Sequence, residues 1–319
     1  MCVNAINMTT LGRTRRVFLI LSVICCLFSN SWIITWISLE INTISFCAVL
    51  LFLINKETLH KESIMKYFIV QSVASALLLL RSSYEIEKRI FIIVWLTIAV
   101  LLKIGRVPFH QWFINVRNLL PLKGGALLIT TQKILPIFLI STLRRWLAFA
   151  FAIINIVVGT ISQYNTKKFM TIIALSSVAN LGWLILASQL CLSTMWSLIR
   201  IYMLNVIMVF IYLTNKERKE TNKNNNETLR TMVLMASLAG IPPLILFLPK
   251  WIISKEIIEQ RALAPTILLL TLSSVRLYIY LRMFTPILIT SPSMKGRLSL
   301  NKPINSLFVI SLMLSVVIV

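Results

Sequence analysis

Long apolar runs recur along the whole chain, and they restrict its fold more than any other feature of the sequence. Runs of about 18 or more apolar residues are long enough to cross the hydrocarbon core of a bilayer as helices. Hydrophobic residues make up 58% of the chain, which is more than a soluble domain keeps away from water. We therefore predict an all-α polytopic membrane protein with about 11 transmembrane helices. The predicted helices cover residues 8–29, 32–54, 63–80, 90–108, 124–143, 146–163, 169–187, 190–214, 229–250, 264–284 and 304–319.

The apolar runs follow one another closely, so we predict a single membrane domain over residues 1–319. One longer connection, residues 215–230 ("NKERKETNKNNNETLR"), is polar and rich in asparagine, which is typical of a surface loop. Arginines precede the apolar stretch of residues 17–28, as they do in a signal peptide, but no small-residue cleavage site follows it. We interpret that stretch as part of the first transmembrane helix.

Lysine and arginine are distributed unevenly between the two sides of the predicted helices. When the sides alternate along the chain, about 18 of these residues fall on the side of the N-terminus and about seven on the other. Positively charged loops tend to stay on the cytoplasm-like side of a membrane. The N-terminus and the 215–230 loop are therefore predicted to lie on that side.

The composition excludes several classes of function. The net charge is +22, but the basic residues punctuate apolar runs and form no basic, aromatic-interleaved segment, so anionic lipid headgroups are a simpler partner than nucleic acid. The five cysteines and two histidines lack the spacing of a zinc, haem or iron–sulfur site. Neither a glycine-rich nucleotide-binding motif nor a catalytic triad is visible. We expect this chain to bind no metal and no redox cofactor.

Among the ionisable residues that lie inside the predicted helices or at their ends, four are the candidate functional residues. Glu40, in "ITWISLEINTISF", is the only acid within the apolar runs, and Lys103, Lys133 and Lys250 lie in three other runs. A charge at the centre of a membrane helix costs about 2.5–3.5 kcal/mol to insert, so each must pair, face water or become neutral. Burial favours neutral forms and pairing favours charged forms, so an intramembrane Glu–Lys pair is suited to a proton relay. The alternative is a structural ion pair that orients helices.

Helix breakers accompany each of the three lysines. They are Gly105 and Pro108 after Lys103, Pro136 after Lys133 (which frees the carbonyl of Gln132), and Pro242, Pro243 and Pro249 before Lys250. Irregular backbone at membrane depth is tolerated only against protein or a water-filled cavity. The coincidence of lysine and breaker in three segments favours a hydrated internal path. Arg200 and Arg276 neighbour no breaker, and we interpret both as structural.

Seven stretches between Ser29 and Arg282, taken in order, resemble one family. These stretches are "SNSWIITWISLEINTISF", "MKYFIVQSVAS", "LLKIGRVPFHQWF", "LLITTQKILP", "NTKKFMTIIALSSVANLGW", "SLAGIPPLILFLPKW" and "LYIYLR". The family is that of the mitochondrially encoded chain-2 subunits of NADH:ubiquinone oxidoreductase, respiratory complex I. The resemblance implies a divergent animal version with about 11 helices, in an antiporter-like bundle with two broken helices. Arg106, Leu246 and Arg276 depart from the residues usual in that family.

The resemblance also implies roles for the four candidate residues. A family Glu–Lys pair on neighbouring helices maps to Glu40 and Lys103, a central lysine maps to Lys133, and a lysine on a second broken helix maps to Lys250. The implied function is proton translocation coupled to NADH oxidation and ubiquinone reduction. The alternatives are a free-standing cation/proton antiporter and a structural membrane-arm scaffold without its own proton path.

Location, cofactors and partners follow from the same resemblance. It implies a multi-pass protein of the mitochondrial inner membrane, with the N-terminus and the polar loop in the matrix. NADH, FMN, iron–sulfur clusters and ubiquinone would be bound by other subunits of the complex. The implied partners are other membrane-arm subunits, including antiporter-like neighbours, and phospholipids such as cardiolipin. No nucleic acid is expected.

Overall fold

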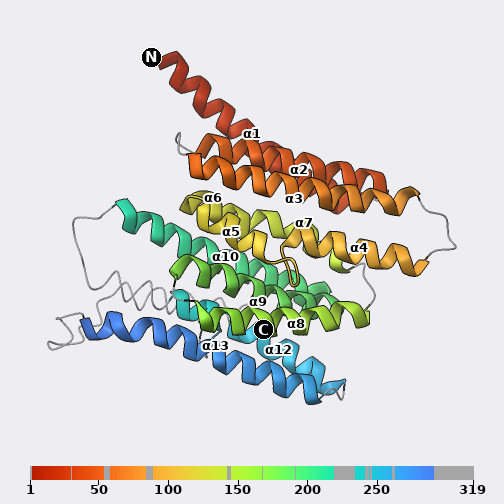
Figure 1. The fold of residues 1–319 in the computed structure, drawn as a ribbon, viewed down its shortest axis with the longest axis vertical. Helices are drawn as coiled ribbons and strands as arrows, with labels where there is room; N and C mark the ends of the chain where they lie inside the picture. Colours follow the sequence, from red (N-terminus) through yellow and green to blue (C-terminus); the bar gives the residue numbers. More distant parts are fainter. Residues whose placement is uncertain are drawn as a thin grey trace. The chain divides into compact units, whose positions relative to one another are not determined.

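The computed structural model is helical, in agreement with the predicted all-α class (Figure 1). It describes residues 2–29, 31–53, 58–83, 89–141, 145–166, 168–190, 192–218, 234–240, 244, 246–260 and 263–290. The chain divides into two compact units, Met1–Arg144 and Arg145–Val319. Each unit is a helical bundle.

The described residues of the first unit form seven helices. They are α1 (Cys2–Phe28), α2 (Trp32–Leu53), α3 (Thr58–Ser83), α4 (Arg89–Ile104), α5 (Gln111–Leu119), α6 (Leu122–Ile129) and α7 (Thr131–Ser141). Helix α2 packs between α1 and α3, and α3 also packs against α4 and α5. Helix α7 packs against α4 and α1. This packing places α4, α5 and α7, which carry the candidate lysines of this unit and their aromatic neighbours, within one bundle.

The labelled helices of the second unit surround α9. They are α8 (Arg145–Asn165), α9 (Phe169–Leu190), α10 (Leu192–Arg218), α12 (Phe247–Glu259) and α13 (Leu263–Thr290), and a short helix over residues 234–239 precedes α12. Helix α9 packs against α8, α10 and α12, and α13 packs against α8 and α12. Almost every side chain between residues 171 and 187 of α9 is buried. A helix that is apolar on all sides is suited to the centre of such a bundle.

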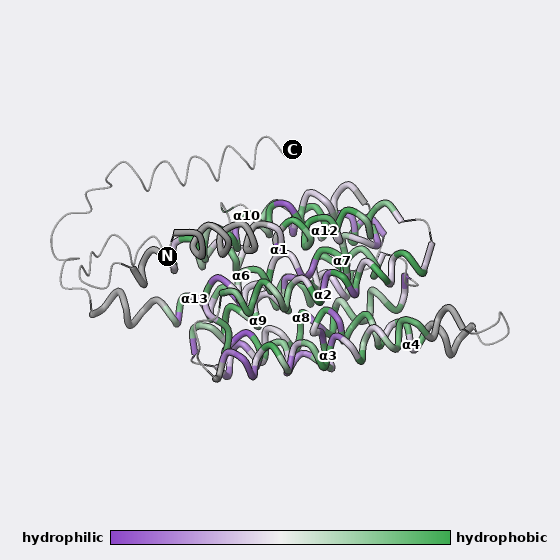
Figure 2. The backbone as a smooth tube through the Cα atoms, turned by 90° about the horizontal axis from the view of Figure 1, so that it is seen from above, coloured by the Kyte–Doolittle hydropathy of each residue, from purple (hydrophilic) through white to green (hydrophobic). Residues whose placement is uncertain are grey.

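Seven helices among the described residues are long and apolar enough to cross a membrane. They are Trp32–Leu53, His60–Leu79, Leu122–Ser141, Arg145–Asn165, Phe169–Leu190, Ser193–Thr214 and Leu263–Met283. Hydrophobic residues line much of these helices (Figure 2), and many large apolar side chains are exposed on their outer faces. Such an apolar exterior is suited to lipid rather than to water. The chain is therefore a multi-pass membrane protein.

The predicted count of about 11 transmembrane helices is not confirmed. Helix α4 is too short to be counted as a span, and the predicted run 229–250 is interrupted after residue 239. The last predicted run, 304–319, lies outside the described residues. Helix α10 continues to Arg218, into the beginning of the predicted 215–230 loop, and the remainder of that loop is also outside the described residues.

The predicted membrane run 124–143 is broken, but the break lies at Thr130. Helix α6 ends there, with Thr130 at φ −100° and ψ −82°, and α7 begins at the next residue. Pro136 lies inside α7, so the helix continues through this proline, which has no N–H to donate to Gln132 O. At the break, the Thr130 hydroxyl donates to Ala126 O at 2.8 Å and the Thr131 hydroxyl donates to Leu127 O at 3.0 Å. Side-chain donors thus reach carbonyls at the end of α6.

Two glycines with positive φ end helical segments. Helix α4 ends at Ile104, and Gly105 follows with φ 70°, so the disturbance predicted next to Lys103 is present. In the second unit Gly240 follows the short helix with φ 81°. Side chains with a Cβ rarely adopt such values. The segment between Gly240 and α12, including Pro242 and Pro243, is described only at Leu244 and Leu246.

Replacing these glycines with alanine is expected to destabilise the protein. A Cβ at Gly105 would lie 2.6 Å from Phe113 Cβ, and one at Gly240 would lie 2.7 Å from Lys250 Nζ. With the unfavourable φ, each substitution should lower the free energy of unfolding by about 1–3 kcal/mol. Gly124→Ala is the control, because its φ is ordinary and the one close contact of its Cβ would be the flexible end of Leu50, at 2.8 Å. Thermal unfolding in detergent measures the difference, and equal midpoints for all three variants would contradict it.

Thr131→Val is expected to destabilise the protein at the break between α6 and α7. The variant keeps the shape of the side chain but removes the donor to Leu127 O, which should cost about 0.5–1.5 kcal/mol of unfolding free energy. Thr131→Ser keeps the hydroxyl and should restore most of the loss. The control is Thr271→Val, which removes an exposed hydroxyl bonded to Leu268 O at 2.9 Å inside α13. If the unfolding midpoint of Thr131→Val is no lower than that of Thr271→Val, the Thr131 hydroxyl does not stabilise the break.

Candidate functional site

Lys103 lies in the last turn of α4 and is buried, with 4% of its surface exposed. Its backbone carbonyl accepts a hydrogen bond of 3.0 Å from Gln71 Nε2 of α3, which fixes the end of α4 against its neighbour. Its ammonium nitrogen has no hydrogen-bond partner among the described residues. Lys103 is thus a buried amine next to a broken helix end, and this makes it a candidate for a group that exchanges protons.

Glu40 lies on α2 and is half-buried. Thr43 Oγ1 lies 3.4 Å from its carboxylate oxygen Oε2. The described residues include no direct ion pair between Glu40 and Lys103, although the two groups interact electrostatically. The structure therefore brings Glu40 and Lys103 into electrostatic range within one unit but not into contact.

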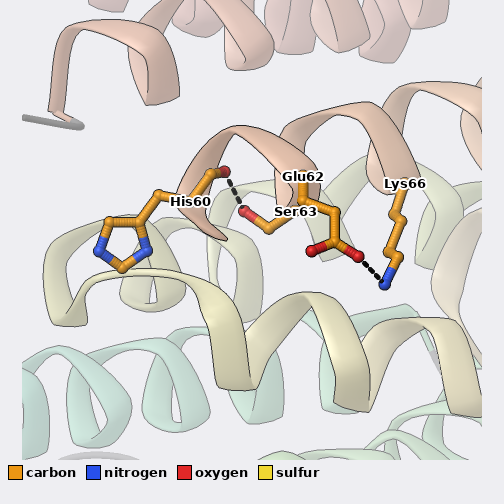
Figure 3. Close-up of polar contacts among 4 residues, drawn as sticks. All are labelled: His60, Glu62, Ser63 and Lys66. Carbon is orange, nitrogen blue, oxygen red and sulfur yellow. Dashed lines mark hydrogen bonds and ion pairs between the residues drawn. The ribbon is translucent and has the colours of Figure 1, made fainter. Parts of the chain in front are cut away.

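One ion pair in direct contact lies on the exposed side of α3. Glu62 and Lys66, one turn apart on α3, point toward each other with Oε1 and Nζ 2.6 Å apart (Figure 3). About half of each side chain is exposed, at 51% and 48%. Exposed pairs of this kind contribute little to stability. Breaking this pair is therefore a suitable control for substitutions of the buried charges.

Lys133 lies in the first turn of α7, directly after the break at Thr130. Its backbone N–H donates to Thr130 O at 3.2 Å, and only 2% of the residue is exposed. The ammonium nitrogen lies 4.6 Å from the centre of the Phe113 ring on α5, the geometry of a cation–π contact. The contact attracts the charged form of Lys133 without a carboxylate.

An aromatic row borders this lysine. The ring centres of Phe46 and Tyr67 are 4.9 Å apart, those of Tyr67 and Trp112 are 6.2 Å apart, and those of Trp112 and Phe113 are 6.1 Å apart. The Tyr67 hydroxyl donates to Gln132 Oε1 at 2.9 Å. This bond ties α3 to the residue before Lys133 and thereby fixes the start of α7.

Two arginines of the first unit are buried beside the candidate site, which the sequence did not indicate. Arg106 follows Gly105 and is completely buried, and it interacts electrostatically with Lys133. Arg117 is also buried, because it lies on the short helix α5 and its guanidinium fills the space beside Gly125. That helix was not foreseen, since "QWFINVRNL" carries polar residues and lies between two apolar runs. The departure noted at Arg106 was the only signal in the sequence.

Lys250 lies in the first turn of α12 in the second unit, with 7% of its surface exposed. Its ammonium group donates to Ala239 O at 2.9 Å, and it lies 6.0 Å from the centre of the Trp183 ring. Ala239 is the last residue of the short helix, and Gly240 leaves space for the lysine side chain because it has no Cβ. A helix end thus supplies the hydrogen-bond acceptor for Lys250.

Other buried polar residues of the second unit lie next to the same helix end. Asn180 Nδ2 donates to Leu238 O at 3.4 Å, and Arg276 Nη1 donates to Asn180 Oδ1 at 2.7 Å. The Ser237 hydroxyl donates to Asn205 Oδ1 at 2.6 Å. Sequence reasoning did not identify Asn180, and it gave Arg276 no role in the site.

Metal ligands do not gather among the described side chains: no group of three or more His, Cys, Asp or Glu residues is close enough to hold an ion. The buried polar groups are instead amines, guanidinium groups, amides and hydroxyls. Such groups can donate, accept and, in the case of lysine, release protons. The prediction that redox cofactors lie on other subunits is neither supported nor opposed by this observation.

Comparison with known proteins gives consistent matches. Residues 81–279 match the family described as "NADH:quinone oxidoreductase/Mrp antiporter, TM". The chain is 31% identical to NADH-ubiquinone oxidoreductase chain 2 of Locusta migratoria, over 80% of this chain and 78% of the relative. It is 30% identical to the protein of the same name from Oryctolagus cuniculus, over 80% of this chain and 79% of the relative.

Two solved structures share the fold. A chain of respiratory complex I from Thermus thermophilus matches with a TM-score of 0.72 and 19% identity, covering 83% of this chain and 68% of the other. A chain of the Mrp complex from Dietzia sp. matches with a TM-score of 0.73 and 14% identity, covering 84% of this chain and 59% of the other. The family match covers more than half of the chain, and the relatives match along most of their length. The chain therefore belongs to the NADH-ubiquinone oxidoreductase chain 2 family and has its antiporter-like helical fold.

Proposed function

We propose that this chain is a membrane-arm subunit of respiratory complex I and translocates protons across the mitochondrial inner membrane. Glu40, Lys103, Lys133 and Lys250 are its proton-handling residues. The observation that carries the proposal is the burial of three lysines, each at or next to an end of a broken helix. Burial disfavours the charged form of an amine, so the surroundings of a buried lysine can change its protonation.

In the first unit, Glu40 acts on Lys103 through space. Its negative charge attracts the proton-bearing form of Lys103, and the absence of direct contact leaves the lysine free to exchange that proton. Electron transfer in other subunits changes the field along the membrane arm. When the influence of Glu40 weakens, the proton leaves Lys103 toward Lys133.

Lys133 is the second carrier of the first unit. The ring of Phe113 stabilises its ammonium form by about 0.5–2 kcal/mol, whereas the permanent charge of Arg106 acts in the opposite direction. In this proposal Lys133 takes up a proton and releases it again.

Lys250 is the carrier of the second unit. Its amine donates to Ala239 O, and either protonation state of an amine can make this bond. Its position stays fixed while its charge changes. We assign it to the exit side of the path or to the link with a neighbouring subunit.

The location, partners and cofactors complete the proposal. The N-terminus and the 215–230 loop lie in the matrix, where the excess of lysine and arginine belongs. Other membrane-arm subunits, including antiporter-like ones, cover part of the surface, and anionic phospholipids such as cardiolipin bind the basic ends of the helices. NADH, FMN, iron–sulfur clusters and ubiquinone are bound by other subunits.

A free-standing cation/proton antiporter is the second candidate function, because the fold also matches a chain of the Mrp complex. The test is ion flux through the purified chain in vesicles. Cation-driven proton flux without electron transfer would favour the antiporter and would contradict the complex I proposal. We expect no such flux.

Substitutions of the candidate lysines in the assembled complex test the proton path. Lys133→Met should lower coupled turnover by about 10²-fold, which is the usual loss on removing a positioned proton-transfer group. Lys133→Arg should be nearly as defective, because arginine keeps the charge but does not release a proton. Glu40→Gln, Lys103→Met and Lys250→Met should each lower the number of protons moved per electron. Proton uptake and NADH oxidation are measured together in vesicles.

The matched control is Glu62→Gln, which breaks the exposed ion pair of α3 with no expected effect on pumping. A structural scaffold predicts a different pattern. Lys133→Arg would then pump normally, since the buried charge is retained, and Lys133→Met would reduce only the amount of assembled complex. That pattern would refute the proposed function.

A further inference from the structure

Arg276 is a fully buried cation that has no place in the proton path described above. It lies on α13 with none of its surface exposed, and the described residues provide no carboxylate in ion-pair contact with it. A guanidinium group remains charged at all relevant pH values. A buried charge without a counter-ion is costly, so the contacts that Arg276 makes are expected to have a specific use.

The contact of Arg276 with Asn180 fixes the orientation of an amide. Arg276 Nη1 and Asn180 Oδ1 are 2.7 Å apart, and both residues are buried. Arginine offers only donors, so the asparagine must present its oxygen to Arg276. The amide nitrogen then faces the other way, toward Leu238 O at 3.4 Å. The chemistry of the arginine, rather than an arbitrary choice between oxygen and nitrogen, determines this orientation.

Asn180 and Lys250 bind successive carbonyls at one helix end. Leu238 O accepts from Asn180, and the next carbonyl, Ala239 O, accepts from Lys250 Nζ at 2.9 Å. The backbone then turns at Gly240 with φ 81°. Because two consecutive carbonyls at the end of this short helix are each bound by a side chain, the position of one limits that of the other.

We propose that Arg276, acting through Asn180, is a positioning residue for Lys250. Arg276 orients the Asn180 amide, Asn180 holds the Leu238 peptide, and the Ala239 carbonyl is thereby presented to the lysine. The inference rests on the proposed function, because it gives Arg276 a role in the proton path only if Lys250 carries protons. It assigns a use to a buried charge that the sequence led us to interpret as structural.

The test uses Arg276→Met, Arg276→Lys and Asn180→Leu in the assembled complex, reconstituted in vesicles. The control is Arg282→Met, on the same helix, because Arg282 is exposed and bonds to Tyr164 O at 2.7 Å, away from Lys250. Arg276→Met and Asn180→Leu should each lower coupled turnover about tenfold, the size expected on losing a hydrogen bond to a charged group. Arg276→Lys should recover part of this loss, since it keeps a charged donor but not the planar fork.

Two readouts separate positioning from general stability. The number of protons moved per electron, measured on equal amounts of assembled complex, should fall in Arg276→Met and Asn180→Leu but not in Arg282→Met. The double variant Arg276→Met/Asn180→Leu should be no worse than either single variant, because both changes interrupt the same chain of contacts. If the Arg276→Met complex fails to assemble, the number of protons moved per electron in Asn180→Leu and Arg276→Lys tests the positioning role instead.

The outcomes distinguish this inference from the proposed function. If Lys250→Met lowers the proton ratio while Arg276→Met and Asn180→Leu pump like Arg282→Met, the positioning role is wrong and the proposed function stands. Additive losses in the double variant would likewise overturn the positioning role. If Lys250→Met pumps normally, Lys250 is no carrier, and both the inference and that part of the proposed function fail.

Discussion

Every backbone polar group at membrane depth needs a partner inside the protein, and this constraint underlies the structure. A continuous helix satisfies it automatically, whereas each break leaves carbonyls and N–H groups that lipid cannot bind. At the break between α6 and α7 the hydroxyls of Thr130 and Thr131 donate to carbonyls of the preceding turn. At the helix end near Gly240 the donors are Asn180 and Lys250. The breaks are thus possible only where polar side chains are brought to them.

The same constraint explains why charges and breaks occur together. A buried lysine needs an acceptor or a polarisable partner, and a broken helix supplies carbonyls that regular helices keep occupied. Lys250 uses such a carbonyl directly, and Lys133 uses the ring of Phe113 next to its break. A lysine placed at a helix break can therefore find an acceptor for its amine and can donate to a carbonyl that the helix leaves unbonded. This placement also produces a buried ionisable group, and such groups are frequent at functional sites.

Local features of the sequence predicted much of this arrangement, and contacts between distant segments set the limit. Apolar run length predicts the membrane helices, and Gly105 correctly indicates where α4 ends. Pro136 did not mark the place of the break, because a proline inside a membrane helix can be accommodated by its neighbours, and the break lies at Thr130. The partner of Arg276 is 96 positions away on another helix. No local pattern contains that pairing, and it decides whether the arginine is an isolated charge or part of the Lys250 site.

The two helix breaks hold their lysines by interactions that respond differently to proton loss. The contact between Lys133 and Phe113 depends on the positive charge, because the ring attracts a cation through its quadrupole. When Lys133 becomes neutral, that attraction is lost. The bond from Lys250 to Ala239 O needs only an N–H donor, so it persists in both protonation states. The contact with Phe113 therefore favours one protonation state of Lys133, whereas the bond to Ala239 O is available to both states of Lys250.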